Sequence, residues 1–183
     1  QTAFVMDRVI RPVIDGMNSE GCPFAGFLYA GLMMTADGPK VLEFNVRSGD
    51  PETQPLMTSL DCDFAEVLAA AAHGELSGVS LKWKPGPSVC VVLASEGYPG
   101  TPKTGNVIHG IDEAEQLGAT VFHAGTKMVD GNLVTSGGRV LDVTAAAETL
   151  PQAIERAYAA VELIHFDGMH CRRDIGQKGL KRW

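Results

Sequence analysis

The sequence of 183 residues lacks several features that would each indicate a particular class of protein. It has no Cys-x-x-Cys pair and no repeat of fixed period, and no apolar run approaches the roughly 20 residues that span a bilayer. Its four cysteines are far apart in the sequence, which favours reduced thiols over a disulfide framework. We therefore expect a cytoplasmic protein with no membrane partner. The cysteines are Cys22, Cys62, Cys90 and Cys171.

The sequence also lacks an excess of positive charge. Lys and Arg total 15 against 22 Asp and Glu, which gives a net charge of −7. Generic nucleic-acid binding depends on a basic patch, so we expect no nucleic-acid partner. The hydrophobic content of 45% and charged content of 20% are instead typical of a globular protein that buries a core.

The order of apolar runs and chain-breaking residues predicts two units with mixed α/β structure. The stretch 74–87 is rich in Gly, Pro and Ser, so we place the boundary there, with units at 1–84 and 85–183. In the first unit we expect a helix at 3–17 with a kink or boundary at Pro12, and a second helix that Asp61 or Asp63 caps and that runs through Ala72 and stops at Gly74. We also expect strands at 27–34 and 40–47 joined by a turn at 36–38. In the second we expect strands at 88–94, 120–124, 127–129, 133–135 and 140–145, and helices at 112–116 and 151–164 capped by Thr149.

The strand expected at 40–47 has two chemically different faces. Glu43, Asn45 and Arg47 stand at i, i+2 and i+4, so on a β-strand they share one face. Mg²⁺ takes one or two oxygens from a protein and the rest from water and phosphates, and arginine binds oxyanions through two hydrogen bonds. The pattern therefore predicts a site for Mg²⁺ and phosphate, with Glu43 and Asn45 as metal ligands. The opposite face is expected to face a core through Leu42, Phe44 and Val46.

The alternative is a half-exposed strand with a solvated polar face. The turn that follows the strand favours a ligand site, because Asp50 is a plausible helix N-cap and Pro51 suits the first helical position. Asp50 and Glu52 are either such caps or groups that orient an amine substrate, and the sequence leaves both possibilities open.

Short sequence blocks in chain order carry a resemblance to a known family. They are Phe27-Leu-Tyr-Ala-Gly-Leu-Met33, Gly38-Pro-Lys-Val-Leu-Glu-Phe-Asn45, Gly49-Asp-Pro-Glu-Thr-Gln54, Gly97-Tyr-Pro-Gly100, Thr104-Gly105, Phe122-His-Ala-Gly-Thr-Lys127, Thr135-Ser-Gly-Gly-Arg-Val-Leu141 and Arg172-Arg-Asp-Ile-Gly176. Together they resemble the phosphoribosylamine–glycine ligases, or glycinamide ribonucleotide synthetases, of the ATP-grasp superfamily. The resemblance runs from about Arg11 nearly to the last residue and covers roughly the C-terminal half of such an enzyme.

The resemblance implies an α/β (α+β) fold: the C-terminal half of an ATP-grasp domain, followed by a small mixed α/β C-terminal domain. It implies a ligase of de novo purine biosynthesis that uses ATP, with Mg²⁺ or Mn²⁺, to phosphorylate the carboxylate of glycine. The amine of 5-phosphoribosylamine then attacks the acyl phosphate, giving glycinamide ribonucleotide, ADP and phosphate. Because the chain begins with Gln inside an amphipathic helix, we expect its partner to be a missing N-terminal half of the same enzyme, without which the chain is inactive.

The resemblance also assigns roles to residues. The family's equivalents of Glu43 and Asn45 hold the metal against the ATP phosphates. Arg47 would be catalytic, stabilising the acyl phosphate or holding a substrate carboxylate, and Asp50 and Glu52 are candidates for substrate binding. Three further candidates could form a backbone nest beside a cation, suited to a ribose 5-phosphate, or an ordinary turn before a strand. They are Gly137, Gly138 and Arg139.

Other interpretations stay open at this point. The spacing of His165, Asp167, His170 and Cys171 matches no closed four-ligand zinc pattern. We expect His165 on the last turn of the final helix. Another ATP-grasp carboxylate–amine ligase or carboxylase would share the Glu-x-Asn strand, although it would lack the blocks at 97–100 and 122–127. A folded, non-catalytic fragment that binds Mg²⁺ or a sugar phosphate is the alternative outside the enzymes.

Overall fold

The computed structural model describes residues 2–181 and divides them into two compact units. The first unit comprises the chain up to Gly49 together with 62–81, and the second comprises 50–61 and the chain from Lys82 onward. The boundary expected after residue 84 is close to the return of the chain at Lys82, whereas 50–61 pack with the second unit. Over 2–181, none of the helices has the length and apolar character needed to cross a bilayer.

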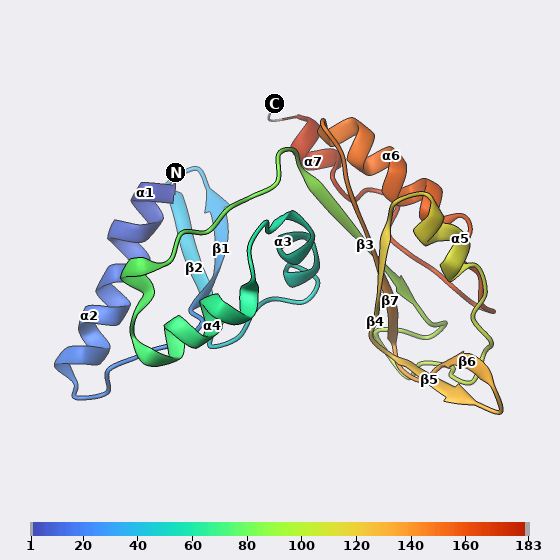
Figure 1. Ribbon diagram of the computed structural model, residues 1–183, viewed down its shortest axis with the longest axis horizontal. Helices are drawn as coiled ribbons and strands as arrows, with labels where there is room; N and C mark the ends of the chain where they lie inside the picture. The colour runs from blue at the N-terminus through green and yellow to red at the C-terminus, as the bar shows by residue number, and fades with distance from the viewer. Residues whose placement is uncertain (1, 182–183) are drawn as a thin grey trace. The chain divides into compact units, whose positions relative to one another are not determined.

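The first unit combines a helical stretch, a β-hairpin and a further helix (Figure 1). The helical stretch is α1 (Thr2–Val5), a π-helical turn η1 (Met6–Ile10) and α2 (Arg11–Ser19). The break in α-helix expected at Pro12 is confirmed, because Pro12 stands at the start of α2 directly after the π-helical turn. The hairpin pairs β1 (Tyr29–Thr35) with β2 (Gly38–Asn45) antiparallel.

The remaining helix of the first unit has both of its expected end signals. In α4 (Phe64–His73), the Asp63 side chain accepts hydrogen bonds from the backbone N–H groups of Ala65 and Glu66. Gly74 ends the helix in the left-handed conformation, with φ at 74°. A 3₁₀ turn η2 (Leu76–Gly78) follows.

The second unit is built on an antiparallel sheet with the strand order β3-β7-β4. Its strands are β3 (Ser88–Ala94), β7 (Arg139–Ala146) and β4 (Thr120–His123). A separate hairpin pairs β5 (Thr126–Val129) with β6 (Asn132–Thr135). The helices are α3 (Thr53–Ser59), α5 (Ile111–Gln116), α6 (Leu150–Val161) and α7 (Gln177–Leu180).

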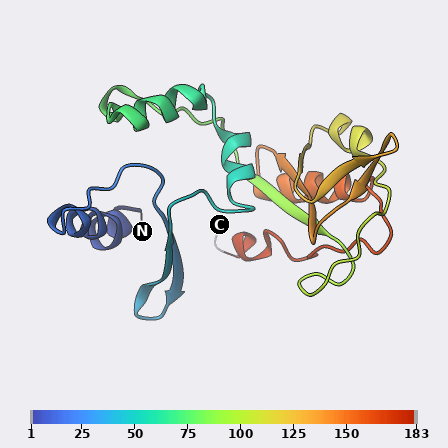
Figure 2. The same ribbon diagram turned by 90° about the horizontal axis from the view of Figure 1, so that it is seen from below.

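Helices cover both faces of this sheet. Figures 1 and 2 show α6 against one face of β3 and β7 and α3 against the other, and both helices contact both strands. The face toward α6 carries the apolar core, including Val91, Leu93 and Val143, each 0% exposed. Because strand side chains alternate, Asp142 and Thr144 project from β7 to the face on which α3 packs. Burial on both faces explains the continuous apolar run of β3.

The structure corrects three local expectations. Asp50 is not a helix N-cap, because α3 begins only at Thr53 and the N-cap position is Glu52, which makes no side-chain cap hydrogen bond. The final helix ends at Val161, so His165 lies beyond it rather than on its last turn. The third concerns Leu42, Phe44 and Val46, which are 64%, 42% and 72% exposed instead of facing a core. The N-cap expected at Thr149 is confirmed as a reciprocal capping box with Gln152.

Candidate functional site

The strand β2 brings Glu43 and Asn45 together on one face, as its alternation predicts. The Asn45 Nδ2 donates a hydrogen bond of 3.1 Å to Glu43 Oε1. Gly31 lies opposite Glu43 across the hairpin, and a Cβ atom at Gly31 would come within 3.1 Å of Glu43 Cγ. Gly31 therefore leaves room for the carboxylate-bearing side chain, a role that its place in the sequence did not reveal.

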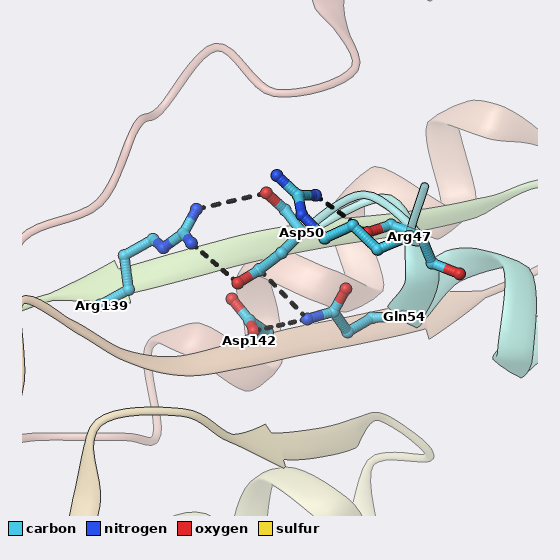
Figure 3. Close-up of polar contacts among 6 residues, drawn as sticks. Arg47, Asp50, Gln54, Arg139 and Asp142 are labelled. Carbon is cyan, nitrogen blue, oxygen red and sulfur yellow. Dashed lines mark hydrogen bonds and ion pairs between the residues drawn. The ribbon is translucent and has the colours of Figure 1, made fainter. Parts of the chain in front are cut away.

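Arg47 does not belong to the same strand face. The strand β2 ends at Asn45, so the alternation that was extended to Arg47 stops two residues earlier. The Arg47 side chain is exposed, and its Nη1 donates a hydrogen bond of 3.0 Å to the carbonyl oxygen of Ser48 (Figure 3). The guanidinium is accessible, but β2 pleating does not set its direction.

In the second unit, Asp50 pairs with Arg139 although 89 residues separate them. The Nη2 of Arg139 lies 2.7 Å from Asp50 Oδ2, and its Nη1 donates a hydrogen bond of 3.2 Å to the Asp50 carbonyl oxygen (Figure 3). The structure thus brings together Asp50 and Arg139, two predicted substrate-binding residues that no sequence pattern connects. Glu52 follows Asp50 by two residues and is exposed.

Gly137 and Gly138 form a tight turn before β7 but not the αR–αL pattern of a backbone nest, since neither has a positive φ. Their carbonyl oxygens accept hydrogen bonds from Ser95, from Oγ to Gly137 at 2.9 Å and from the backbone N–H to Gly138 at 2.8 Å. A Cβ atom on Gly138 would lie 2.5 Å from Cδ2 of Tyr98. The glycine at 138 therefore lets the Tyr98 ring approach the backbone.

A cavity of about 360 Å³ in the second unit gives Arg139 and Tyr98 a shared surface. Its wall also contains the polar side chains of His170 and Arg172, beside apolar side chains such as Val92 and Ile175. Arg172 donates two hydrogen bonds, of 2.9 and 2.7 Å, to the side chain of Asp174. Sequence reasoning missed Tyr98, His170 and Arg172 as site residues, although two of them stand in blocks that carried the family resemblance.

A buried carboxylate lies behind this wall. Asp142 is 2% exposed, and its Oδ2 accepts a hydrogen bond of 2.7 Å from Gln54 Nε2. Burial raises the pKa of Asp142, and the negative charge of Asp50 adds to the rise, while Gln54 and Arg139 oppose it. Burial also raises the pKa of the neighbouring Cys90 thiol to about 12.

The remaining candidates do not assemble into a metal centre. Among residues 2–181, no group of three or more His, Cys, Asp or Glu side chains is placed to hold a metal ion. His165 and Asp167 form an exposed pair at 3.8 Å, and His170 faces the cavity just described. His123 at the end of β4 is exposed, and its Nδ1 lies 3.1 Å from Thr126 Oγ1.

Comparison with known proteins gives this chain its family. Residues 1–53 match the model of the phosphoribosylglycinamide synthetase ATP-grasp (A) domain, and 88–178 match that of the phosphoribosylglycinamide synthetase C domain. The chain is 50% identical over 186 residues to the phosphoribosylamine–glycine ligase of Vibrio cholerae, covering 99% of this chain. The chain belongs to the phosphoribosylamine–glycine ligase family.

Two further relatives of this ligase family agree in sequence and structure. The Arabidopsis thaliana protein named "Phosphoribosylamine–glycine ligase, chloroplastic" is 50% identical over 184 residues, which is 98% of this chain. The crystal structure of the Thermotoga maritima phosphoribosylamine–glycine ligase superposes with a TM-score of 0.73 at 39% identity, covering 87% of this chain and 39% of that one. The mixed α/β fold with an ATP-grasp part and a C domain is thereby confirmed.

The match extends over only part of each ligase. This chain covers 43% of the Vibrio cholerae protein and 35% of the Arabidopsis thaliana protein, in each case less than half. The matched part is the C-terminal part of the relatives, as the sequence blocks indicated. What the complete enzymes bind and convert is therefore a matter of proposal for this chain.

Proposed function

We propose that this chain supplies the metal-binding strand and the C-terminal domain of a phosphoribosylamine–glycine ligase of purine biosynthesis. The reaction transfers the γ-phosphoryl group of ATP to the carboxylate of glycine. The amine of 5-phosphoribosylamine then attacks the acyl carbon and expels phosphate, giving glycinamide ribonucleotide and ADP. The observation that carries the proposal is the Glu43–Asn45 pair on β2, in a chain whose first 53 residues match an ATP-grasp domain.

The donor set on β2 fits Mg²⁺ or Mn²⁺. A carboxylate and an amide oxygen are hard ligands, and two protein oxygens leave positions for phosphate and water. In the structure the Asn45 nitrogen faces Glu43, so Asn45 must turn its amide over to offer its oxygen beside the carboxylate. A bound divalent cation would neutralise charge on the transferred phosphoryl group. Arg47 is proposed to hold an oxyanion of the substrate, because its guanidinium is exposed.

The cavity of the second unit fits the phosphate of the amine substrate. Arg139 and Arg172 offer guanidinium groups, which bind phosphate bidentately, and His170 and Tyr98 add polar groups to the same wall. Asp50 occupies two N–H groups of Arg139, and a guanidinium carries five, so donors remain for a ligand. In this proposal Gly138 leaves room for the Tyr98 ring, and Asp50 holds Arg139 in place. Gly137 and Glu52 remain candidates for substrate binding because they are close to these residues in the sequence.

A chimera tests the proposed reaction. The N-terminal part of the Vibrio cholerae relative would be joined to this chain at the start of the matched region, and ADP release measured with ATP, glycine and phosphoribosylamine. We expect turnover that depends on both substrates, and no ADP release from this chain by itself, because phosphoryl transfer requires a fully assembled ATP site. An inactive but folded chimera, or ADP release that does not depend on phosphoribosylamine, would contradict the proposal.

Variants of the chimera test the metal site. Glu43→Gln removes one anionic ligand and is expected to lower turnover by about two orders of magnitude or more. Asp37→Asn is the matched control, since Asp37 is an exposed carboxylate in the turn of the same hairpin, and it should retain full activity. Mn²⁺ titration followed by electron paramagnetic resonance should show the same order of effects. A Glu43→Gln chimera with normal turnover would remove Glu43 from the metal site.

A further inference from the structure

Asp142 occupies an unfavourable place for a carboxylate. It lies in β7 between Leu141 and Val143, is 2% exposed, and its Oδ1 has no hydrogen-bond partner among the described residues. A buried polar oxygen without a partner lowers stability, and more so when it is charged. The other oxygen, Oδ2, makes a close hydrogen bond of 2.7 Å with Gln54. The Asp142 carboxylate therefore keeps its hydrogen bond with Gln54 although its burial and its unpaired Oδ1 lower stability.

That contact begins a chain of side chains leading to the cavity (Figure 3). The same Gln54 nitrogen that donates to Asp142 lies 3.4 Å from Asp50 Oδ1. The other oxygen of Asp50 accepts from Arg139 at 2.7 Å, and Arg139 forms part of the cavity wall. The amide nitrogen of Gln54 thus links the buried Asp142 to the exposed Asp50. Asp50 in turn forms an ion pair with Arg139.

The surface ion pair is too weak to orient Arg139 by itself. The side chains of Arg139 and Asp50 are 36% and 47% exposed, and pairs that exposed contribute little stability because water screens them. An arginine that must be ordered when a ligand arrives binds less tightly than one already held in place. The 2.7 Å hydrogen bond to the buried Asp142 gives Gln54 a defined position, from which the same nitrogen also reaches Asp50 at 3.4 Å.

We propose that Asp142 is a positioning residue: through Gln54 and Asp50 it fixes the direction in which Arg139 presents its guanidinium to a sugar phosphate in the cavity. This inference rests on the proposed function for the identity of the ligand, but not for the chain of contacts. Asp142 itself does not contact the ligand. Asn in its place keeps the accepting oxygen and should preserve the arrangement, whereas an apolar residue should release Gln54.

The test uses the full 183-residue chain and ribose 5-phosphate as the probe. Binding would be measured by NMR titration for wild type, Asp142→Asn, Asp142→Val and Gln54→Ala. We expect affinity within about twofold of wild type for Asp142→Asn and about tenfold weaker for Asp142→Val and Gln54→Ala. Thr144→Val is the matched control, since Thr144 is buried on the same face of β7, and it should leave affinity unchanged.

The double variant separates positioning from general support of the fold. In the Gln54→Ala background, Asp142→Val should weaken binding no further, because the chain of contacts is already broken. Lower stability of Asp142→Val with unchanged affinity would show a structural role only and overturn the proposal. A full additional loss of affinity in the double variant would show that Asp142 does not act through Gln54. If Asp142→Val fails to fold, Gln54→Ala tests the same step from the other end.

A second readout keeps this inference distinct from the proposed function. Rotation of the Arg139 guanidinium about its Nε–Cζ bond can be followed by ¹⁵N NMR without any ligand. We expect slow rotation in wild type and Asp142→Asn, and fast rotation in Gln54→Ala. If wild type binds no ribose 5-phosphate but shows this pattern, the ligand assignment fails and the positioning chain stands. Fast rotation in wild type would overturn the positioning role.

Discussion

Replacing Gly138 with alanine would test the packing of Tyr98 at the cavity wall. The added Cβ would stand 2.5 Å from Cδ2 and 3.2 Å from Cε2 of the ring. Carbon atoms in favourable contact lie about 3.5–4.0 Å apart, so the ring must move by about 1 Å. Gly138 does not have a positive φ, so alanine adds no backbone strain there and the ring alone decides the outcome.

The expected effect on stability follows from how freely the ring can move. Overpacking a closed core costs about 1–3 kcal/mol. Tyr98 is 39% exposed and can swing toward solvent, so we expect Gly138→Ala to lower the free energy of unfolding of the second unit by about 1 kcal/mol, the low end of that range. Because Tyr98 lines the same cavity as Arg139, binding of ribose 5-phosphate should weaken as well.

The assay is a double-mutant cycle with Tyr98→Ala. Amide hydrogen exchange in β3 and β7 would report the stability of the second unit alone. Gly138→Ala should have little effect once the ring has been removed, and Gly78→Ala should be near neutral throughout, because a Cβ at Gly78 meets nothing within 4 Å. An equal loss with and without the Tyr98 ring would refute the steric reasoning.

Four further predictions address other parts of the second unit. Thr149→Ala removes the N-cap of α6 and should cost about 1 kcal/mol in thermal unfolding, while Leu93→Ala opens a cavity in the core and should cost about 2–5 kcal/mol. The Cys90 thiol, with its pKa raised to about 12, should resist a thiolate-specific reagent at pH 8 in the folded chain and react after denaturation. Burial, then the charge of Asp50, raises the pKa of Asp142 above its unfolded value, so this group favours folding at low pH and loses that contribution as pH rises through its folded pKa. Asp142→Asn should flatten that part of the stability profile, and an unchanged profile would show that another group titrates.

Structural features that depend on only a few neighbouring residues can be predicted from the sequence. The strand at 88–94 is predicted to the residue, and the cap expected at Thr149 forms. Of the two caps that the sequence allows for α4, Asp61 and Asp63, the structure has Asp63. The pairing of Glu43 with Asn45 was also predictable, because alternation within one strand needs no information about the rest of the fold.

Structural features that depend on contacts between distant parts of the chain cannot be predicted from local sequence patterns. The pairing of Asp50 with Arg139 spans 89 residues, and no local pattern indicates it. Asp142 stands in an apolar strand, and its hydrogen-bond partner Gln54 lies 88 residues earlier in the chain, so no local pattern indicates its role. The exposed Leu42, Phe44 and Val46 show that alternation separates two faces of a strand without telling which of them is covered.

The assignment of α3 to the second unit affects how the protein can be divided. A segment of 12 residues, 50–61, interrupts the first unit and belongs to the second, so the chain passes between the units at three points. A truncated chain that starts after residue 84 would lose α3 and expose the sheet face that carries Cys90, Asp142 and Thr144. In such a truncated chain these normally buried side chains would contact water, so its stability and binding would differ from those of the intact C domain. An intact second unit must carry 50–61 with it, for instance by circular permutation.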